Sequence, residues 1–258
     1  AKPDDLVLTV GGANTKTVEL IAGTGEHAAG LFVNYKSGLQ DGGTHTAVIE
    51  ASDSIVLDGT AAEVGGTGLR VQGQVKDKTT VTFDATDITI KGSEVGIVAT
   101  GGARVSVDGS SAGVIEISAE NGNAIAARGE SVVDINTSGN KTVKINGDIS
   151  FGKYYNTPVT DKVNGADADV NLNLTTSDSY LTGKIVVENA DGVSDQNKEG
   201  IKDVDGMKLG LSNGATWNVT GDSFVNQLAA KDGNLVKAKG VENVTLTVTG
   251  DAAAAGTA

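Results

Sequence analysis

The hydrophobic and polar positions of this chain alternate in short runs that recur at a nearly constant distance. Between Val81 and Ile145 the runs return in the same order of three. They are Val81-Thr82-Phe83, Ile88-Thr89-Ile90, Gly96-Ile97-Val98-Ala99, Val105-Ser106-Val107, Ile115-Glu116-Ile117, Ala124-Ile125-Ala126-Ala127, Val133-Asp134-Ile135 and Val143-Lys144-Ile145. Alternation with a period of two predicts half-buried strands. The Gly, Asn, Asp and Ser residues between the runs predict turns.

The spacing of these runs predicts how the strands assemble. The second run recurs after 27 residues, from Ile88 to Ile115, and again after 28, at Val143. A repeat of three short strands without a helix buries its apolar face only by stacking on its neighbours, which makes a solenoid. The pattern therefore predicts an all-β fold, a right-handed parallel β-helix with three strands per turn. At about 28 residues per turn, the 258 residues make roughly nine turns with inserted loops.

The alternation also assigns each side chain to a face. In the third strand the pattern places one set inward: Leu31, Leu69, Ile97 and Ile125, with Val33, Val71, Ala99 and Ala127 beside them. The outward ladder of that strand is Phe32, Arg70, Val98 and Ala126. In the middle strand the outward ladder is Thr89, Glu116 and Lys144, which predicts an ion pair between Glu116 and Lys144. Leu31 and Leu69 are 38 residues apart, and this longer gap predicts an inserted loop at 36–46.

The regular pattern ends after Asp148. Residues 151–158 hold three of the nine aromatic residues and one of the two prolines, which predicts a loop or sheet edge. A larger repeat of 37 residues follows, from Leu172 to Leu209 and from Tyr180 to Trp217. We therefore expect a single segment, 1–258, which subdivides into regular coils at 1–150 and coils with longer loops at 151–258.

The stretch 209–223 carries a specific resemblance. It reads Leu-Gly-Leu-Ser-Asn-Gly-Ala-Thr-Trp-Asn-Val-Thr-Gly-Asp-Ser. It resembles the repeat of pertactin-like passenger domains of bacterial autotransporters, which are type V secretion proteins. The segment 172–183 is a looser copy, with Tyr180 in the place of Trp217.

The resemblance implies a location and a broad function. Such passengers are β-helices secreted across the outer membrane to the bacterial cell surface, where most act in adhesion and virulence. Relatives of this kind end in a membrane β-barrel, and no matching stretch is present here. We expect membrane contact only through such an absent C-terminal barrel. The polar start and low-complexity end of the sequence suggest a mature or excised segment of a longer protein.

Composition and charge narrow the class of partner. The chain has 36 Gly and few aromatic residues, so the interior is expected to consist of thin aliphatic ladders. A formal net charge of −13 disfavours nucleic acid and anionic membrane surfaces. There is no Cys, which suits a chain that crosses a membrane unfolded. No apolar run reaches the roughly 20 residues of a membrane-spanning helix.

Tyr154, Tyr155 and Phe32 are the candidate ligand-contact residues. The paired tyrosines stand in a loop with Lys and Pro, where amphipathic rings serve interfaces well. Alternatively they fold back over the end of a groove. Phe32 is a weaker candidate, since the adjacent loop could cover it. For such residues, the resemblance to autotransporter passengers implies a protein or glycan ligand on a host or bacterial surface.

The sequence predicts neither a catalytic residue nor a metal or other cofactor. Gly221-Asp222-Ser223 resembles a nucleophile motif, but His27 and His45 are many turns away, so a turn is the better interpretation. The acidic loop Asp191–Asp205 matches no calcium-binding pattern. Polysaccharide-cleaving enzymes need clustered carboxylates, whereas Asp134 and Glu116 stand singly.

We therefore expect an adhesin passenger segment rather than an enzyme. Three alternatives stay open. The rod could self-associate side by side through polar ladders, it could be a carbohydrate-active β-helix enzyme, or it could be a spacer for a functional head located elsewhere.

Overall fold

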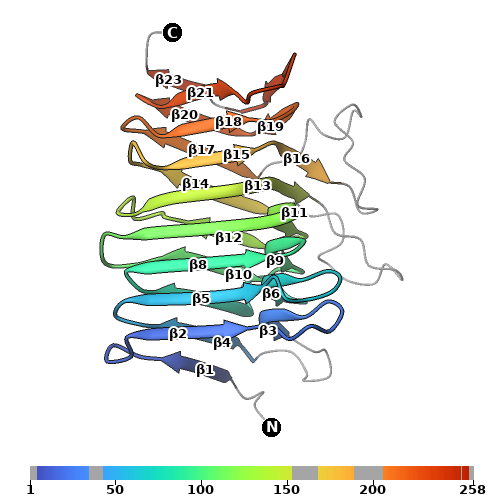
Figure 1. The fold of residues 1–258 in the computed structure, drawn as a ribbon, viewed down its shortest axis with the longest axis vertical. Helices are drawn as coiled ribbons and strands as arrows, with labels where there is room; N and C mark the ends of the chain where they lie inside the picture. Colours follow the sequence, from blue (N-terminus) through green and yellow to red (C-terminus); the bar gives the residue numbers. More distant parts are fainter. Residues whose placement is uncertain (1–4, 35–42, 153–167, 189–205, 251, 256–258) are drawn as a thin grey trace.

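The structure is a computed structural model that describes residues 5–34, 43–152, 168–188, 206–250 and 252–255. Within these ranges every regular element is a strand, and every strand pair is parallel (Figure 1). The described residues include no helix that could cross a bilayer. The fold is thus all-β and is built from long stacked parallel sheets, an arrangement consistent with a solenoid.

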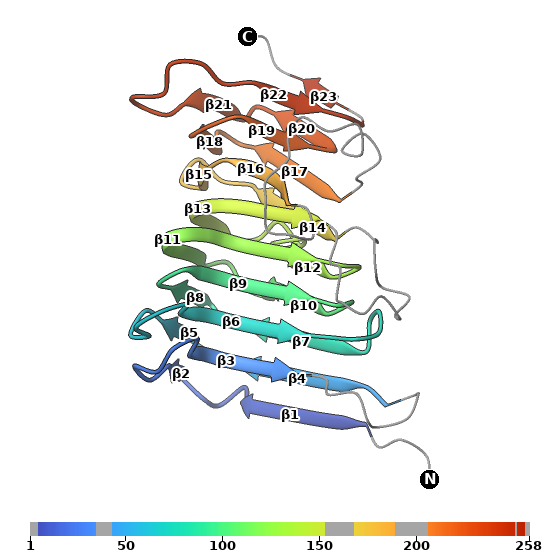
Figure 2. The ribbon, with the colours of Figure 1, turned by 90° about the vertical axis from the view of Figure 1, so that its right-hand side faces the viewer.

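Two large sheets run through the molecule, with the repeats stacked from the N- to the C-terminal end (Figure 2). The first sheet contains, in order, β1 (Leu6–Gly11), β4 (His45–Glu50), β7 (Thr79–Asp84), β10 (Arg104–Asp108), β12 (Val132–Ile135), β14 (Asp169–Leu174), β17 (Met207–Ser212), β20 (Gln227–Lys231) and β23 (Ala252–Ala255). Each strand pairs with the equivalent strand of the next repeat.

The second sheet holds the other strands of each repeat. Its main path is β2 (Thr17–Ile21), β5 (Ser54–Gly59), β8 (Asp87–Gly92), β11 (Val114–Arg128), β13 (Thr142–Gly152), β15 (Tyr180–Gly183), β18 (Thr216–Val219) and β21 (Asn234–Lys237). Four strands join it from the side: β3 (Ala29–Asn34), β6 (Thr67–Gln72), β9 (Val95–Thr100) and β16 (Ile185–Glu188). A small separate sheet pairs β19 (Ser223–Val225) with β22 (Leu246–Val248).

The eight predicted runs are all confirmed as strands, and their inward positions form the core. On the third strand Leu69, Ile97 and Ile125 are fully buried and in register, as predicted, while Leu31 is partly buried against them. The small residue before each of these runs is required by packing. A Cβ at Gly96 would lie 2.5 Å from the carbonyl oxygen of Ala124 and would force the repeats apart.

The second and third strands of the repeat are not always separate, contrary to the predicted turn between them. β11 carries both the Ile115 and the Ala124 runs in one element of 15 residues. Similarly, β13 carries the Val143 run together with the equivalent of the third strand in one element. The register shifts between Ser118 and Asn123, which bends the strand without ending it. The regular pairing also continues past Asp148, because Ile149 and Phe151 pair with β16.

The extra residues of the early repeats lie in two places rather than one. Part of the excess falls between β3 and β4, near the predicted loop, although residues 35–42 lie outside the described ranges. Most of the rest lies between β5 and β6, where residues 60–66 occupy the position that residues 93–94 fill one repeat later. The prediction of a single inserted loop at 36–46 is therefore only partly correct.

The 37-residue repeat is confirmed in the first sheet but wrong in the second. Leu172 pairs with Leu209, at the predicted offset. In the second sheet, however, Trp217 pairs with Leu181, and Tyr180 pairs with Thr216. The chain takes seven residues from Leu174 to Leu181 and only six from Leu211 to Trp217. Because strand side chains alternate, this single residue puts Trp217 inside and Tyr180 outside.

Candidate functional site

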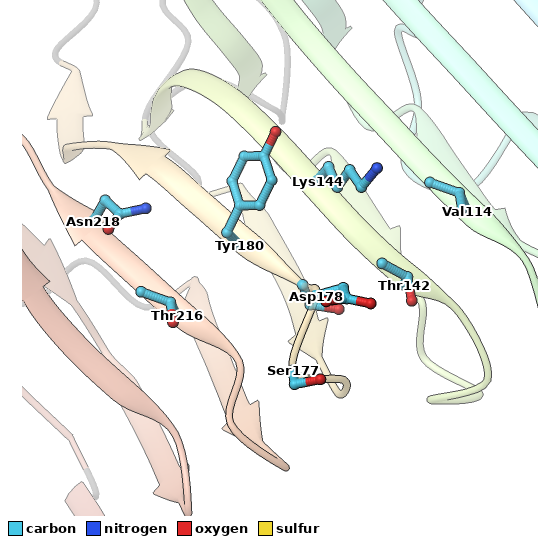
Figure 3. Close-up of a pocket in the computed structure, with 9 residues that line it drawn as sticks. Val114, Thr142, Lys144, Ser177, Asp178, Tyr180, Thr216 and Asn218 are labelled. Atoms are coloured by element: carbon cyan, nitrogen blue, oxygen red, sulfur yellow. The ribbon is translucent and has the colours of Figure 1, made fainter.

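The outward face of β11, β13, β15 and β18 carries a groove of about 580 Å³. Figure 3 shows the side chains that line it, with the ring of Tyr180 between Asn218 and Lys144. The lining also includes Asp178 from the turn before β15, and Thr216 from β18. The groove crosses successive repeats, since each strand contributes one or two side chains.

The register explains why these side chains meet. Lys144 pairs with Tyr180, and Tyr180 pairs with Thr216, so the three stand in one outward ladder across neighbouring strands. Leu181 and Trp217, the next residues on the same strands, are fully buried. The inward aliphatic and aromatic residues therefore fix the strand orientation that presents the polar row to solvent.

A hydrogen bond holds the Tyr180 ring in place. Its hydroxyl oxygen accepts a bond of 3.2 Å from Nδ2 of Asn146 on β13. Two positions along, Asn218 Nδ2 donates to Thr182 Oγ1 at 3.1 Å. Tyr180 is half-buried, so part of its side chain stays accessible to solvent.

The turn before β15 forms a rigid rim of the groove. Ser179 is buried, and its hydroxyl accepts a bond of 3.0 Å from the backbone N–H of Val143. The Thr176 hydroxyl shares hydrogen bonds with Ser179 Oγ, at 2.9 Å, and with Thr142 Oγ1, at 3.0 Å. These bonds tie the turn to β13 and place the exposed Asp178 at the rim.

The predicted ion pair lies at one end of the groove. Lys144 Nζ is 3.3 Å from Glu116 Oε1, which confirms the outward ladder of Thr89, Glu116 and Lys144. The carboxylate of Glu116 thus neutralises the charge of Lys144, the residue that pairs with Tyr180 in the ladder. Together with Asp178, the groove carries no excess of positive charge.

The structure places the predicted contact residues away from this groove or outside its description. Phe32 is 49% exposed on β3, and the Arg70 guanidinium lies 5.4 Å from its ring centroid, in line with the predicted ladder. The early strands β3 and β6 are several repeats from Tyr180, so Phe32 and the groove are separate. Tyr154 and Tyr155 lie outside the described residues, as does the acidic loop Asp191–Asp205.

The hydroxyl of Ser223, the candidate nucleophile, is hydrogen-bonded to the backbone on both sides. Ser223 is buried, and its hydroxyl donates to the Gly221 carbonyl at 2.9 Å and accepts from the Ile185 N–H at 3.2 Å. Ser223 begins β19, so the residues before it form the turn that the sequence favoured.

The single carboxylates of the outward ladders are both engaged. Asp134 accepts from Arg104 at 2.6 Å and from Asn171 Nδ2 at 2.7 Å. Glu116 contacts Lys144, as described above. Asp134 lies on the first sheet and Glu116 on the second, so the two stand on different faces.

Sequence reasoning missed a row of polar residues at the end of the first-sheet strands. Glu50, Asp84 and Asp108 pair in register, and Asn136 and Asn173 occupy the equivalent positions in the next two repeats. The signal was present, because an acid or Asn directly follows each first run.

We call this row of polar residues at the end of the first-sheet strands the polar corner. Asp108 shows how it contributes to the fold. Its carboxylate accepts hydrogen bonds from Thr137 Oγ1, from Ser138 N and Oγ, and from Gly109 N. Burial alone would raise the pKa of Asp108, but these hydrogen bonds outweigh it and hold the pKa below the ordinary 3.8. The corner thus links one repeat to the next through charged hydrogen bonds.

A fully buried lysine lies beneath the same corner. Lys141 Nζ donates to the carbonyl oxygens of Ala85, at 2.7 Å, and of Thr86 and Ser111, both at 2.9 Å. Burial lowers the pKa of Lys141, while nearby Asp84, Asp87 and Asp108 oppose the shift. In the sequence, Asn140-Lys141-Thr142 gives no sign of this role, because it has the composition of an exposed turn.

Comparison with known proteins does not assign the chain to a family. No protein-family model, curated protein or solved structure matches the chain. Among the described residues, no three acidic or histidine side chains gather in a way that could hold a metal ion.

Proposed function

We propose that this chain is the ligand-binding passenger segment of a bacterial adhesin, displayed at the cell surface. In this proposal the stacked parallel sheets are a right-handed β-helix of the pertactin-like kind, with three strands per turn. The inward ladders and polar corner hold the rod together, and the outward face makes contact with a host, matrix or bacterial ligand. The fold supports this role because stacked repeats present a long continuous surface.

One observation carries the proposal, namely the groove around Tyr180. It combines an accessible aromatic ring with amide, hydroxyl and charged groups on a rigid backbone. Interfaces favour tyrosine because it gives contact area and a hydrogen bond at a low cost in conformational entropy. The volume falls within the range of ligand sites in proteins.

Binding of the purified full chain tests the proposal. The chain would be applied to immobilised glycans, matrix proteins and whole cells, beside the Tyr180→Ala and the double Tyr154→Ala, Tyr155→Ala variants. We expect saturable binding that Tyr180→Ala weakens. Saturable binding that only the double variant abolishes would move the site to the 151–158 segment. Absence of binding to every surface would refute the adhesin role of this segment.

Self-association is a second candidate, favoured by the outward face of the first sheet. Thr82 pairs with Ser106 across β7 and β10, Thr80 pairs with Thr46 across β7 and β4, and all four are half-buried. Short polar side chains of this kind allow two rods to approach closely and share hydrogen bonds. Sedimentation over a range of concentrations tests it. A mass that rises with concentration supports pairing, and a constant monomer mass refutes it.

A further inference from the structure

We infer that the groove around Tyr180 binds an uncharged oligosaccharide that lies across the strands, along the direction in which the repeats stack. The inference rests on the proposed function and specifies its ligand. Three features of the groove lead to it: the fixed aromatic ring, the surrounding amides and hydroxyls, and the balance of charge.

The ring of Tyr180 provides a stacking surface of fixed orientation. Asn146 Nδ2 holds the hydroxyl at 3.2 Å, and the neighbouring strand residues Lys144 and Thr216 flank the ring in the ladder. The C–H face of a pyranose is apolar and packs on an aromatic ring, while its hydroxyl groups remain free at the edges. A ring fixed before binding loses little entropy when a ligand stacks on it.

The groups around the ring match the hydroxyl edges of a sugar. Asn218 and Thr216 line the groove on β18, and Thr142 lines it on β13 (Figure 3). Amides and hydroxyls can each donate and accept hydrogen bonds. A sugar hydroxyl does both, so such a row can satisfy several hydroxyls without a fixed pattern of donors.

The charges of the groove favour an uncharged ligand. Lys144 is paired with Glu116 at 3.3 Å, and Asp178 adds an exposed carboxylate at the rim. A sulfated or carboxylated sugar would meet no unpaired cation among the described lining residues and would approach a chain of net charge −13. Repulsion of this kind disfavours anionic sugars and has little effect on the affinity for an uncharged sugar.

The direction of the groove fits a chain of sugar units. Its lining comes from β11, β13, β15 and β18, which are successive neighbours in the sheet. Neighbouring strands lie about 4.8 Å apart, close to the length of one pyranose unit in an extended oligosaccharide. Each unit can therefore meet the side chains of one strand.

The test measures binding of the full chain to cells and to free sugars in parallel. Cells are used untreated, after protease treatment, or after mild periodate oxidation, which cleaves the vicinal diols of sugars. Neutral β-linked gluco-oligosaccharides of increasing length, together with heparin fragments as the sulfated comparison, serve as soluble competitors. Tyr180→Ala is compared with Tyr180→Phe and with Thr89→Ala, an outward residue of the same ladder outside the groove.

The inference predicts binding that resists protease and is lost after periodate. Longer neutral oligosaccharides should compete better than short ones, and heparin fragments should not compete. Tyr180→Ala should raise the Kd at least about ten-fold, which corresponds to about 1.4 kcal/mol, because an anchoring aromatic residue carries much of the binding energy. Tyr180→Phe should retain most of the binding, and Thr89→Ala all of it.

Other outcomes separate this inference from the proposed function. Cell binding that needs Tyr180 but survives periodate and is lost after protease would overturn the sugar ligand and leave the adhesin role intact. Binding that is lost after periodate but unchanged in Tyr180→Ala would overturn the groove as the site. Circular dichroism of each variant ensures that lost binding does not reflect unfolding.

Discussion

Two regions of the second sheet stack their repeats in different ways. From β8 to β13 each middle strand turns two aliphatic side chains inward, such as Ile115 and Ile117 on β11, and Val143 and Ile145 take the same places in the next repeat. From β15 to β18 the inward residues change from Leu181 and Gly183 to Trp217 and Val219. The first region consists of uniform ladders, whereas the second has one large side chain opposite small or aliphatic neighbours.

The difference shows what keeps a repeat in register. In the uniform region the sequence period and the structural period agree, because every turn between equivalent strands has nearly the same length. In the second region the turn before β18 is one residue shorter, and the sheet compensates by pairing Trp217 with Leu181. Burial of the indole decides the register, since a slip of β18 by one residue would expose Trp217 and turn Thr216 and Asn218 inward.

Truncation of Trp217 should have the largest effect on stability. Trp217 is fully buried, and its Nε1 donates to the Gly183 carbonyl at 2.9 Å. Trp217→Ala should therefore lower the free energy of unfolding by about 3–5 kcal/mol, measured by urea denaturation. Tyr180→Ala is the matched comparison on the outward face and should cost less than about 1 kcal/mol. Equal losses in the two variants would contradict the assignment of the two rings to opposite faces.

Removal of the buried amine of Lys141 should have the second-largest effect on stability. Lys141→Met keeps most of the side-chain volume but leaves the carbonyls of Ala85, Thr86 and Ser111 without their donor. We expect a loss of about 2–4 kcal/mol, because unsatisfied buried acceptors are costly.

Lys184→Met is the control for this change, since its side chain is 41% exposed and lies 3.7 Å from Asp148. It should change the stability by less than about 0.5 kcal/mol. A similar small effect in Lys141→Met would mean that the uniform region is held by its aliphatic ladders alone.

The sequence predicted the parts of the fold that depend on alternation. The inward ladders through Ile97 and Ile125, and the outward pair of Glu116 and Lys144, follow from a period of two and a constant repeat. The alignment of Tyr180 with Trp217 was wrong because it matched aromatic residues by type, whereas the strand register depends on the length of the preceding turn.

The polar corner was less predictable for a different reason. Asp108 could have been found from the acid that follows each first run. Lys141 could not, because its amine reaches carbonyls from two earlier repeats, and this contact depends on how turns stack rather than on local sequence. The groove was missed because the alignment of Tyr180 with Trp217 left the outward ladder ending at Lys144, whereas it continues through Tyr180 and Thr216.

The smallest effect should come from the corner carboxylate, and it should depend on pH. Asp108→Asn keeps the shape but weakens the hydrogen bonds from Thr137, Ser138 and Gly109. Because the pKa of Asp108 is depressed on folding, its contribution is present above the unfolded value of about 3.8 and is lost as pH falls through the lower folded value. We expect a deficit of about 1 kcal/mol near neutral pH, given the partial exposure of the site.

The pH profile distinguishes this effect from simple loss of packing. Thermal unfolding of the wild type and Asp108→Asn should differ near neutral pH and converge in acid, where the native carboxylate is protonated. Asp53→Asn provides the control, because that exposed carboxylate accepts from its neighbour Ser52 alone among the described side chains. A deficit for Asp108→Asn that stays constant into acid would mean that the corner stabilises the uniform region through shape rather than charge. The contrast between the two regions would then lie in packing alone.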